Sequence, residues 1–81
     1  MILEMYAIKD ELNGYTVPIP FTSEEIAKRY LKDQVMGNPT VKNTAEDFSI
    51  WKIGTWDGES GTFIMLPNGN QLIERAKNYV K

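Results

Sequence analysis

Aromatic side chains with lysines and an arginine nearby are the residues of this sequence best suited to chemistry. Every nucleobase has a flat ring face, so exposed aromatic rings stack on single-stranded nucleic acid with little sequence preference, while Lys and Arg neutralise phosphates. The predicted nucleic-acid-binding set combines both types and consists of Tyr6, Trp51, Trp56, Lys28, Arg29, Lys32 and Lys52. Phe63 is a further candidate ring, and Lys9 and Lys42 are further candidate cations.

The same residues have a simpler structural interpretation. Aromatic residues on strands usually belong to the core, and a run such as Lys28, Arg29 and Lys32 usually marks the solvated face of a helix. The two interpretations differ in one observable property, because a stacking ring must be exposed and a core ring must be buried.

Enzymatic chemistry has little support in the residue types. The chain contains no histidine and no cysteine, which excludes Ser-His-Asp catalysis, cysteine nucleophiles and thiolate metal sites. The carboxylate pairs Glu46-Asp47 and Asp57/Glu59 lack the spacing of a calcium-binding loop and are typical of turns. We therefore expect no catalytic residues, no metal site and no cofactor, and a protein that is not an enzyme.

Length and charge set further limits. With 81 residues, of which 42% are hydrophobic and 25% charged, the chain is predicted to form one folded domain over residues 1–81. Its 9 basic and 11 acidic residues give a formal net charge of −2, so binding to nucleic acid requires a local cationic patch. The apolar runs fall far short of the ~20 residues that cross a bilayer, and no membrane partner is expected.

Local signals predict that the elements begin with a β-hairpin over residues 2–17. Asn13-Gly14 is a strong turn pair because both residues tolerate positive φ. Pro18 and Pro20 are expected to end the second strand, since neither can donate a ladder hydrogen bond.

A helix is predicted to follow, beginning near Ser23. Glu25 completes the capping signal, and apolar residues then recur at spacings of three and four. Gly37 is expected to end the helix in a left-handed conformation. The polar residues 38–47 are expected to form an irregular connection.

The remaining chain predicts a second hairpin over residues 48–66, turning at Asp57-Gly58, and a second helix over residues 70–80. The order β-β-α-β-β-α predicts an α+β fold of two layers, with a roughly four-stranded antiparallel sheet and helices packed on one face. The other sheet face then needs a ligand, a partner or a second copy to cover it.

Several segments together resemble a known family. They are Met5-Tyr6-Ala7-Ile8-Lys9-Asp10, Tyr15 to Pro20-Phe21, the helix with Ala27, Arg29 and Tyr30, and above all Glu46-Asp47-Phe48-Ser49-Ile50-Trp51-Lys52-Ile53-Gly54-Thr55-Trp56-Asp57 with Gly61. Over residues 5–66 the chain resembles the small nonstructural protein of gokushovirus-type microviruses. The resemblance implies a DNA-binding or nonstructural protein like the microviral C protein, which acts in the switch from genome replication to packaging of single-stranded DNA, in the host cytoplasm.

Two hypotheses follow for the function. The first is a non-enzymatic phage accessory protein that binds single-stranded DNA or the replication complex during genome synthesis and packaging, with viral replication or packaging proteins as partners. The alternative is a protein-interaction module, a homodimer, that engages a viral or host replication protein through the apolar sheet face without contacting DNA.

Overall fold

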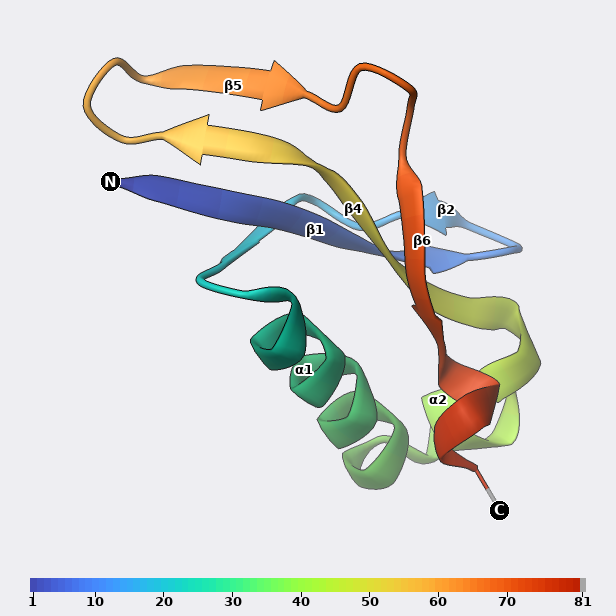
Figure 1. The fold of residues 1–81 in the computed structure, drawn as a ribbon. Coiled ribbons are helices and arrows are strands. Elements are labelled where there is room, and N and C mark those ends of the chain that lie inside the picture. The colour runs from blue at the N-terminus through green and yellow to red at the C-terminus, as the bar shows by residue number, and fades with distance from the viewer. Residues whose placement is uncertain (81) are drawn as a thin grey trace.

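Two long antiparallel strands form the centre of the molecule. In the computed structural model, which describes residues 1–80, β1 (Ile2–Asp10) pairs along its whole length with β4 (Phe48–Asp57). The register runs from Ile2 opposite Asp57 to Asp10 opposite Phe48, with one β-bulge beside the bond between Met5 and Tyr6. Figure 1 shows this pair crossing the molecule, with α1 on one side of it.

Each central strand carries two short antiparallel strands on its outer edge. On β1 these are β2 (Gly14–Tyr15) and β3 (Ile19–Phe21), and on β4 they are β5 (Thr62–Met65) and β6 (Gln71–Arg75). The sheet therefore has six strands but is about four strands wide. The predicted α+β class, antiparallel sheet and two hairpins are confirmed, while the predicted order of elements is wrong.

The first helix, α1 (Glu24–Gly37), begins where the sequence predicts. The hydroxyl of Ser23 accepts a hydrogen bond from the Ile26 backbone N–H at 3.3 Å, which satisfies one free donor of the first turn. The helix buries a stripe of three residues against the sheet: Ala27, Leu31 and Val35. The spacing of four between them places these side chains on one face.

The end of α1 differs from the prediction. Gly37 is still helical and the chain leaves through Asn38, whose φ of −125° is extended, so the expected left-handed glycine cap is wrong. The physical reason is that Asn38 already starts the next helix, because its side-chain oxygen accepts from the Thr40 backbone N–H at 3.0 Å. The segment 38–47, expected to be irregular, contains α2 (Pro39–Asn43) and the 3-10 turn η1 (Ala45–Asp47).

The predicted helix over residues 70–80 is also wrong. Residues Gln71–Arg75 form β6 and Ala76–Tyr79 form a 3-10 turn, η2. The inner half of β4 offers unpaired backbone groups on its outer edge, and pairing with β6 satisfies them. The apolar spacing that suggested a helix still buries Ala76 and packs Ile73 against the core, but from a strand and a turn.

Strand β3 is a smaller correction, because it includes Pro20, which was expected to terminate pairing. Pro20 lies opposite Met5 on an edge strand. Proline is tolerated there because β3 lies at the edge of the sheet, where the missing backbone N–H of Pro20 does not interrupt the hydrogen bonds of a central strand.

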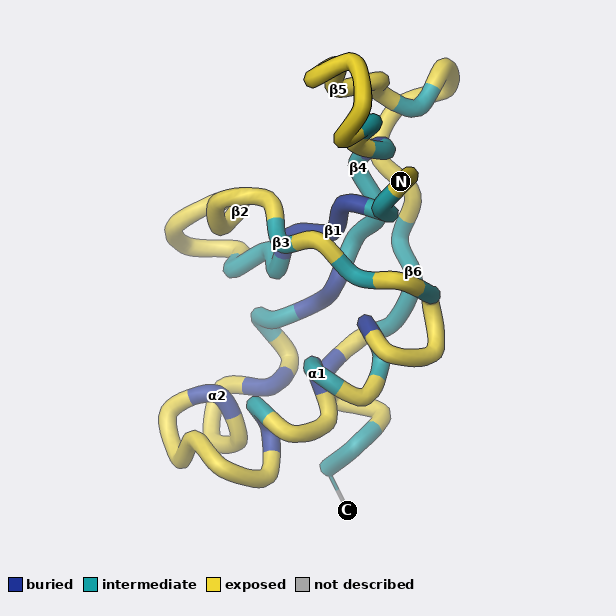
Figure 2. Tube along the Cα trace, turned by 90° about the vertical axis from the view of Figure 1, so that its left-hand side faces the viewer, coloured by how far each residue is buried: buried dark blue, intermediate teal, exposed yellow. Residues whose placement is uncertain are grey.

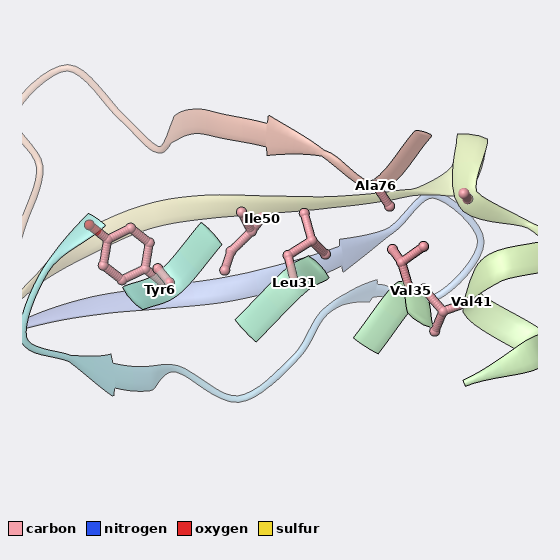
Figure 3. Packing of buried hydrophobic residues seen from close by; sticks show 8 residues of the cluster. Tyr6, Leu31, Val35, Val41, Ile50 and Ala76 are labelled. Atoms are coloured by element: carbon pink, nitrogen blue, oxygen red, sulfur yellow. The ribbon is translucent and has the colours of Figure 1, made fainter. Parts of the chain in front are cut away.

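The core lies between α1 and the inner parts of β1 and β4. Its largest fully buried side chains are Tyr6, Leu31, Val35 and Ile50, and Figure 3 shows them facing one another together with Val41 and Ala76. Figure 2 shows that the buried segments gather in this layer, whereas β5 and the β1–β2 turn are exposed. The helices cover one face of the sheet, and the opposite face has no second layer.

Candidate nucleic-acid interface

The sheet face opposite α1, here called the open face, begins with Trp51. Successive residues of a strand point to opposite faces, and Ile50, the residue before Trp51, is fully buried under α1. Trp51 therefore points away from the helices and is partly exposed. Its indole N–H donates a 2.8 Å hydrogen bond to the hydroxyl of Ser49, two residues earlier on the same face.

A lysine lies between two aromatic rings on this face. The Lys9 ammonium is 5.5 Å from the centre of the Trp51 ring and 5.6 Å from the centre of the Tyr15 ring. The two rings meet edge to face, with their centres 6.2 Å apart and an interplanar angle of 80°. Both distances from the ammonium are within the range of a cation–π interaction.

The β1–β2 turn fixes this arrangement. Asp10 accepts hydrogen bonds from the Leu12 backbone N–H and the Asn13 side chain, each at 3.0 Å, and Gly14 takes a positive φ of 85°. The register that results places Tyr15 directly opposite Lys9. The turn over residues 11–13, followed by the positive φ of Gly14, thus sets which ring lies beside the lysine.

A second cation belongs to the same row of the sheet. Lys9 on β1 lies opposite Ser49 on β4, and Ser49 lies opposite Arg75 on β6. Side chains that oppose one another across strands share a face. Among residues 1–80, no carboxylate lies within 4.0 Å of the Arg75 guanidinium. We call this group the open-face cluster, and it consists of Lys9, Tyr15, Ser49, Trp51 and Arg75.

Within residues 1–80, one acidic side chain forms an ion pair with a cation of the cluster. The Lys9 ammonium is 3.7 Å from a carboxylate oxygen of Glu11, which is itself half exposed. An exposed ion pair of this kind contributes little to stability. Lys9 can therefore exchange this carboxylate for a phosphate at small cost.

Trp56 lies on the same strand and the same sheet face as Trp51, but farther from the helices. Trp56 is opposite Leu3 and Trp51 is opposite Ala7, and these two partners share a face of β1. Trp56 also lies opposite Phe63 on β5, and the two aromatic residues are 36% and 37% exposed. No lysine or arginine occurs between residues 52 and 75, so the paired segments 54–57 and 62–65 around this second aromatic pair carry no side-chain cation.

Tyr6 is corrected from a stacking residue to a core residue. It is fully buried, packs edge to face against Phe21 with ring centres 5.8 Å apart, and donates a 2.6 Å hydrogen bond to the Glu4 carboxylate. Burial first, and then this hydrogen bond and the negative charge of Glu4, raise the pKa of the Tyr6 phenol well above its usual range. Its ring has no free face for a base.

The four predicted cations do not gather around Trp51. The Lys52 ammonium is 3.4 Å from the Glu4 carboxylate, and Lys28 is 3.8 Å from Glu24 one helical turn away. Arg29 and Lys32 are exposed on α1. Because α1 packs on the sheet face opposite Trp51, Lys28, Arg29 and Lys32 are separated from the open-face cluster by the sheet itself.

Of the open-face cluster only Trp51 belongs to the predicted set, and Lys9 was a further candidate cation; Tyr15, Ser49 and Arg75 were not predicted. Tyr15 lies opposite Lys9 because the turn spans residues 11–13, whereas a two-residue Asn13-Gly14 turn would have paired Tyr15 with Leu12. Arg75 was hidden by the predicted helix over residues 70–80, in which it has no relation to the sheet. Only its pairing with β4 reveals its position.

These features define a small two-layer α+β protein whose uncovered sheet face carries paired aromatic rings and cations. The family model described as Phage ORF5 protein matches residues 3–79, and the chain belongs to this family of bacteriophage proteins. No curated protein and no solved structure matches the chain. None of the helices within residues 1–80 has the length and apolar character needed to cross a membrane.

Proposed function

We propose that this protein is a non-enzymatic accessory protein of a gokushovirus-type microvirus, acting in the host cytoplasm. It binds single-stranded DNA or the replication complex while the viral genome is synthesised and packaged, in the manner of a microviral C protein. Membership of the Phage ORF5 family and the resemblance of residues 5–66 support the viral setting. The observation that carries the binding role is the Lys9 ammonium placed between the rings of Tyr15 and Trp51 on the open face.

The open-face cluster suits a single strand for two reasons. Bases of a single strand are free to stack on the Tyr15 and Trp51 rings, and such stacking is worth about 1–3 kcal/mol per base. Lys9 and Arg75 lie in the same cross-strand row and can neutralise the phosphates that flank a stacked base. The ladder of the sheet presents both kinds of contact on one surface.

The cations of α1 offer a second surface for phosphates. Lys28, Arg29 and Lys32 lie on the other side of the sheet, so a strand bound there does not reach Trp51. The acidic net charge of −2 makes either surface a local attraction rather than a property of the whole molecule. We place the DNA on the open face because the Lys9 ammonium lies against two aromatic rings there and Arg75 belongs to the same cross-strand row.

The first experiment measures fluorescence anisotropy of a labelled single strand of about 30 nucleotides, titrated with the protein at low and at physiological salt. Binding that weakens as salt rises is expected, because contact with phosphates releases counterions. No binding at low salt would contradict direct contact with DNA.

Charge variants then locate the surface. The double variant Lys9→Gln/Arg75→Gln is expected to weaken binding to all sequences and to flatten the salt slope by up to ~1.4 units, about 0.7 for each single-strand phosphate lost. Lys77→Gln is the matched control, because Lys77 lies on η2 beside a hollow lined by α2 and η1. If Lys28→Gln/Arg29→Gln/Lys32→Gln lowers the slope and the double variant does not, the DNA lies on α1.

Tryptophan fluorescence tests stacking directly. In Trp56→Phe, Trp51 is the only remaining tryptophan, and DNA is expected to quench its emission because a base covers the ring. The reciprocal variant Trp51→Phe reports on Trp56, whose surroundings lack side-chain cations, and weaker quenching is expected there. Equal quenching in both variants would remove the special role of the open-face cluster.

A second candidate function is the protein-interaction module, which engages a viral or host replication protein and does not touch DNA. The observation that favours it is the exposed apolar surface formed by residues such as Phe63, Ile64 and Met65. Absence of DNA binding in the anisotropy experiment, together with a folded protein, would favour this module.

A further inference from the structure

The outer end of the β4–β5 hairpin extends beyond the helical layer. We call residues 54–66 the arm; it contains the outer half of β4, the turn after Asp57 and strand β5, and the start of β1 pairs along it. Figure 1 shows β5 at the end of the sheet away from α1 and α2. The exposed large apolar residues of this region are Met1, Ile2, Trp56, Phe63, Ile64 and Met65.

Strand β5 has one free edge. It is the last strand in the order β2-β1-β4-β5 and pairs only with β4. The Leu66 N–H donates to the Ile53 carbonyl at 3.3 Å, which fixes the phase of the ladder. Hydrogen-bonded pairs alternate along antiparallel strands, so Ile64 bonds to β4 while the backbone N–H and C=O of Phe63 and Met65 point to the free edge.

This edge lacks the features that usually protect an exposed strand. Natural proteins place charged residues, prolines or bulges on free edges to prevent pairing with other chains. The sequence of β5, Thr62 to Met65, has no charge and no proline, and its register with β4 is regular. An unprotected apolar edge of this kind is suited to receive another strand.

We infer that the occupant of this edge is β5 of a second copy of the chain, paired antiparallel about a two-fold axis at Ile64. In that register Phe63 lies opposite Met65 of the partner subunit, and the reverse pair is identical. The outward backbone groups of these two residues then form four hydrogen bonds between the copies. Pro67 at one end and the turn after Asp57 at the other limit the pairing to this short segment.

Side chains and charges agree with this partner. On one sheet face, Phe63 meets Met65 of the partner subunit, which is a favourable aromatic–sulfur pairing; on the other, Ile64 meets its own copy. Each copy has an acidic turn with Asp57 and Glu59 at one end of β5. The antiparallel arrangement places the two turns at opposite ends of the strand pair, so their negative charges stay apart. Nucleic acid does not fit the arm, because its only charged side chains, Asp57 and Glu59, are acidic.

The inference is independent of DNA binding but has a consequence for it. The two-fold axis of such a strand pair is perpendicular to the sheet, so the open faces of both copies lie on the same side. The dimer would present two open-face clusters on one continuous sheet.

Two variants test the inference, starting from sedimentation equilibrium of the unmodified chain over a range of concentrations. We expect twice the monomer mass at high concentration. Ile64→Lys places two like charges face to face at the axis and is expected to raise the dissociation constant at least about tenfold. Val17→Lys is the matched control, because Val17 is an equally apolar, 81% exposed residue outside the arm.

A cross-link locates the contact. The chain has no cysteine, so Ile64→Cys introduces a single thiol, and a non-hydrogen-bonded pair at a two-fold axis brings the Cα atoms to about 4.5 Å, within disulfide range. Rapid oxidation to a covalent dimer is expected for this variant and not for Val17→Cys. A monomer at every concentration, or a dimer that survives Ile64→Lys without cross-linking through position 64, would overturn the inference.

Discussion

The two tryptophans of this chain lie on one strand and on one sheet face, yet their surroundings differ in almost every respect. Around Trp51 the sheet is backed by α1, the reverse face is dry core, and two cations share the row beside the ring. Around Trp56 no helix backs the sheet, the neighbouring residues of β5 are exposed, and the charged side chains of the arm are acidic. In the half of the sheet that α1 backs, a packed core supports a charged open face. The arm has no helix behind it, and its exposed apolar residues are suited to contact with another chain.

The comparison shows that a second layer, rather than residue type, decides the role of an aromatic residue here. Tyr6 and Trp56 both belong to the central strand pair. Tyr6 lies on the sheet face that α1 covers and is fully buried, whereas Trp56 lies on the open face and is 36% exposed. A pattern of aromatic residues along a strand therefore cannot be assigned to core or surface until the face that the helical layer covers is known.

The largest expected effect concerns the packing between α1 and the sheet. Leu31→Ala removes a fully buried side chain between α1 and the sheet and is expected to lower the free energy of unfolding by about 2–5 kcal/mol. Urea unfolding followed by circular dichroism measures the change. Ile26→Ala on the exposed side of the same helix is the control, with an expected change within about 0.5 kcal/mol. Equal losses in both variants would contradict the assigned core.

The next effect concerns the arm. A Cβ at Gly54 would overlap the Ile64 backbone oxygen and lie 3.0 Å from the Phe63 ring, so Gly54→Ala forces β5 away from β4. We expect a loss of about 1–3 kcal/mol in unfolding free energy. Gly37→Ala has open space around the new methyl group and is expected to stabilise the protein by about 0.4–1 kcal/mol. If the two substitutions change the free energy of unfolding in opposite directions, the loss in Gly54→Ala comes from the close contact with β5 and not from replacing a glycine by alanine in general.

A third prediction uses pH to test whether the Tyr6 phenol is buried on the sheet face that α1 covers. The folded state raises the pKa of Tyr6 above the ordinary tyrosine value of 10.0, so its contribution to stability is complete below about pH 10 and is lost as pH rises further. Tyr6→Phe is expected to cost about 1 kcal/mol at neutral pH, where it loses the hydrogen bond to Glu4. The stability difference between the two proteins, measured by urea unfolding, should narrow above pH 10. A constant difference would contradict burial of the phenol.

The smallest effect is expected in the turn of the arm. The Asp57 carboxylate accepts a 2.9 Å hydrogen bond from the Glu59 N–H and a longer one from the Ser60 N–H; these hydrogen bonds, the one from Glu59 first, hold the Asp57 pKa below its ordinary value of 3.8. The stabilisation is therefore present above about pH 3.8 and is lost as pH falls below it. Thermal unfolding of Asp57→Asn against the unmodified protein should show a small difference at pH 7 that shrinks below pH 3.8.

Local signals were sufficient for the elements whose causes are local. The cap at Ser23 located α1, and the Asn13-Gly14 and Asp57-Gly58 pairs located both hairpins. The helix prediction for residues 70–80 was wrong because the spacing of Leu72, Ile73 and Ala76 also fits one face of a helix. What selects a strand there is the unpaired edge of β4, a partner about 20 residues earlier in the chain.

The candidate site was predictable only in part for the same reason. Trp51 was identified, and its exposure follows from the burial of Ile50. The sequence predicted a cationic cluster on α1 because Lys28, Arg29 and Lys32 are close together in the chain. The helix places them on the other side of the sheet. Lys9 and Arg75 lie near opposite ends of the chain, and only the register of three strands brings them into one row.

The pairing of β1 with β4 also determines the order in which the protein assembles. The first hairpin and α1 contain only nearby contacts, and such elements form within microseconds. The central ladder must instead close a loop that contains the entire helical segment, and closing a loop of this length costs chain entropy before any contact compensates it. During synthesis, β1 has no β4 partner until the residues from Phe48 onward have left the ribosome, and its pairing is complete only when Asp57 follows. We expect formation of this ladder to limit the folding rate, and chains caught before that step to be the ones that aggregate.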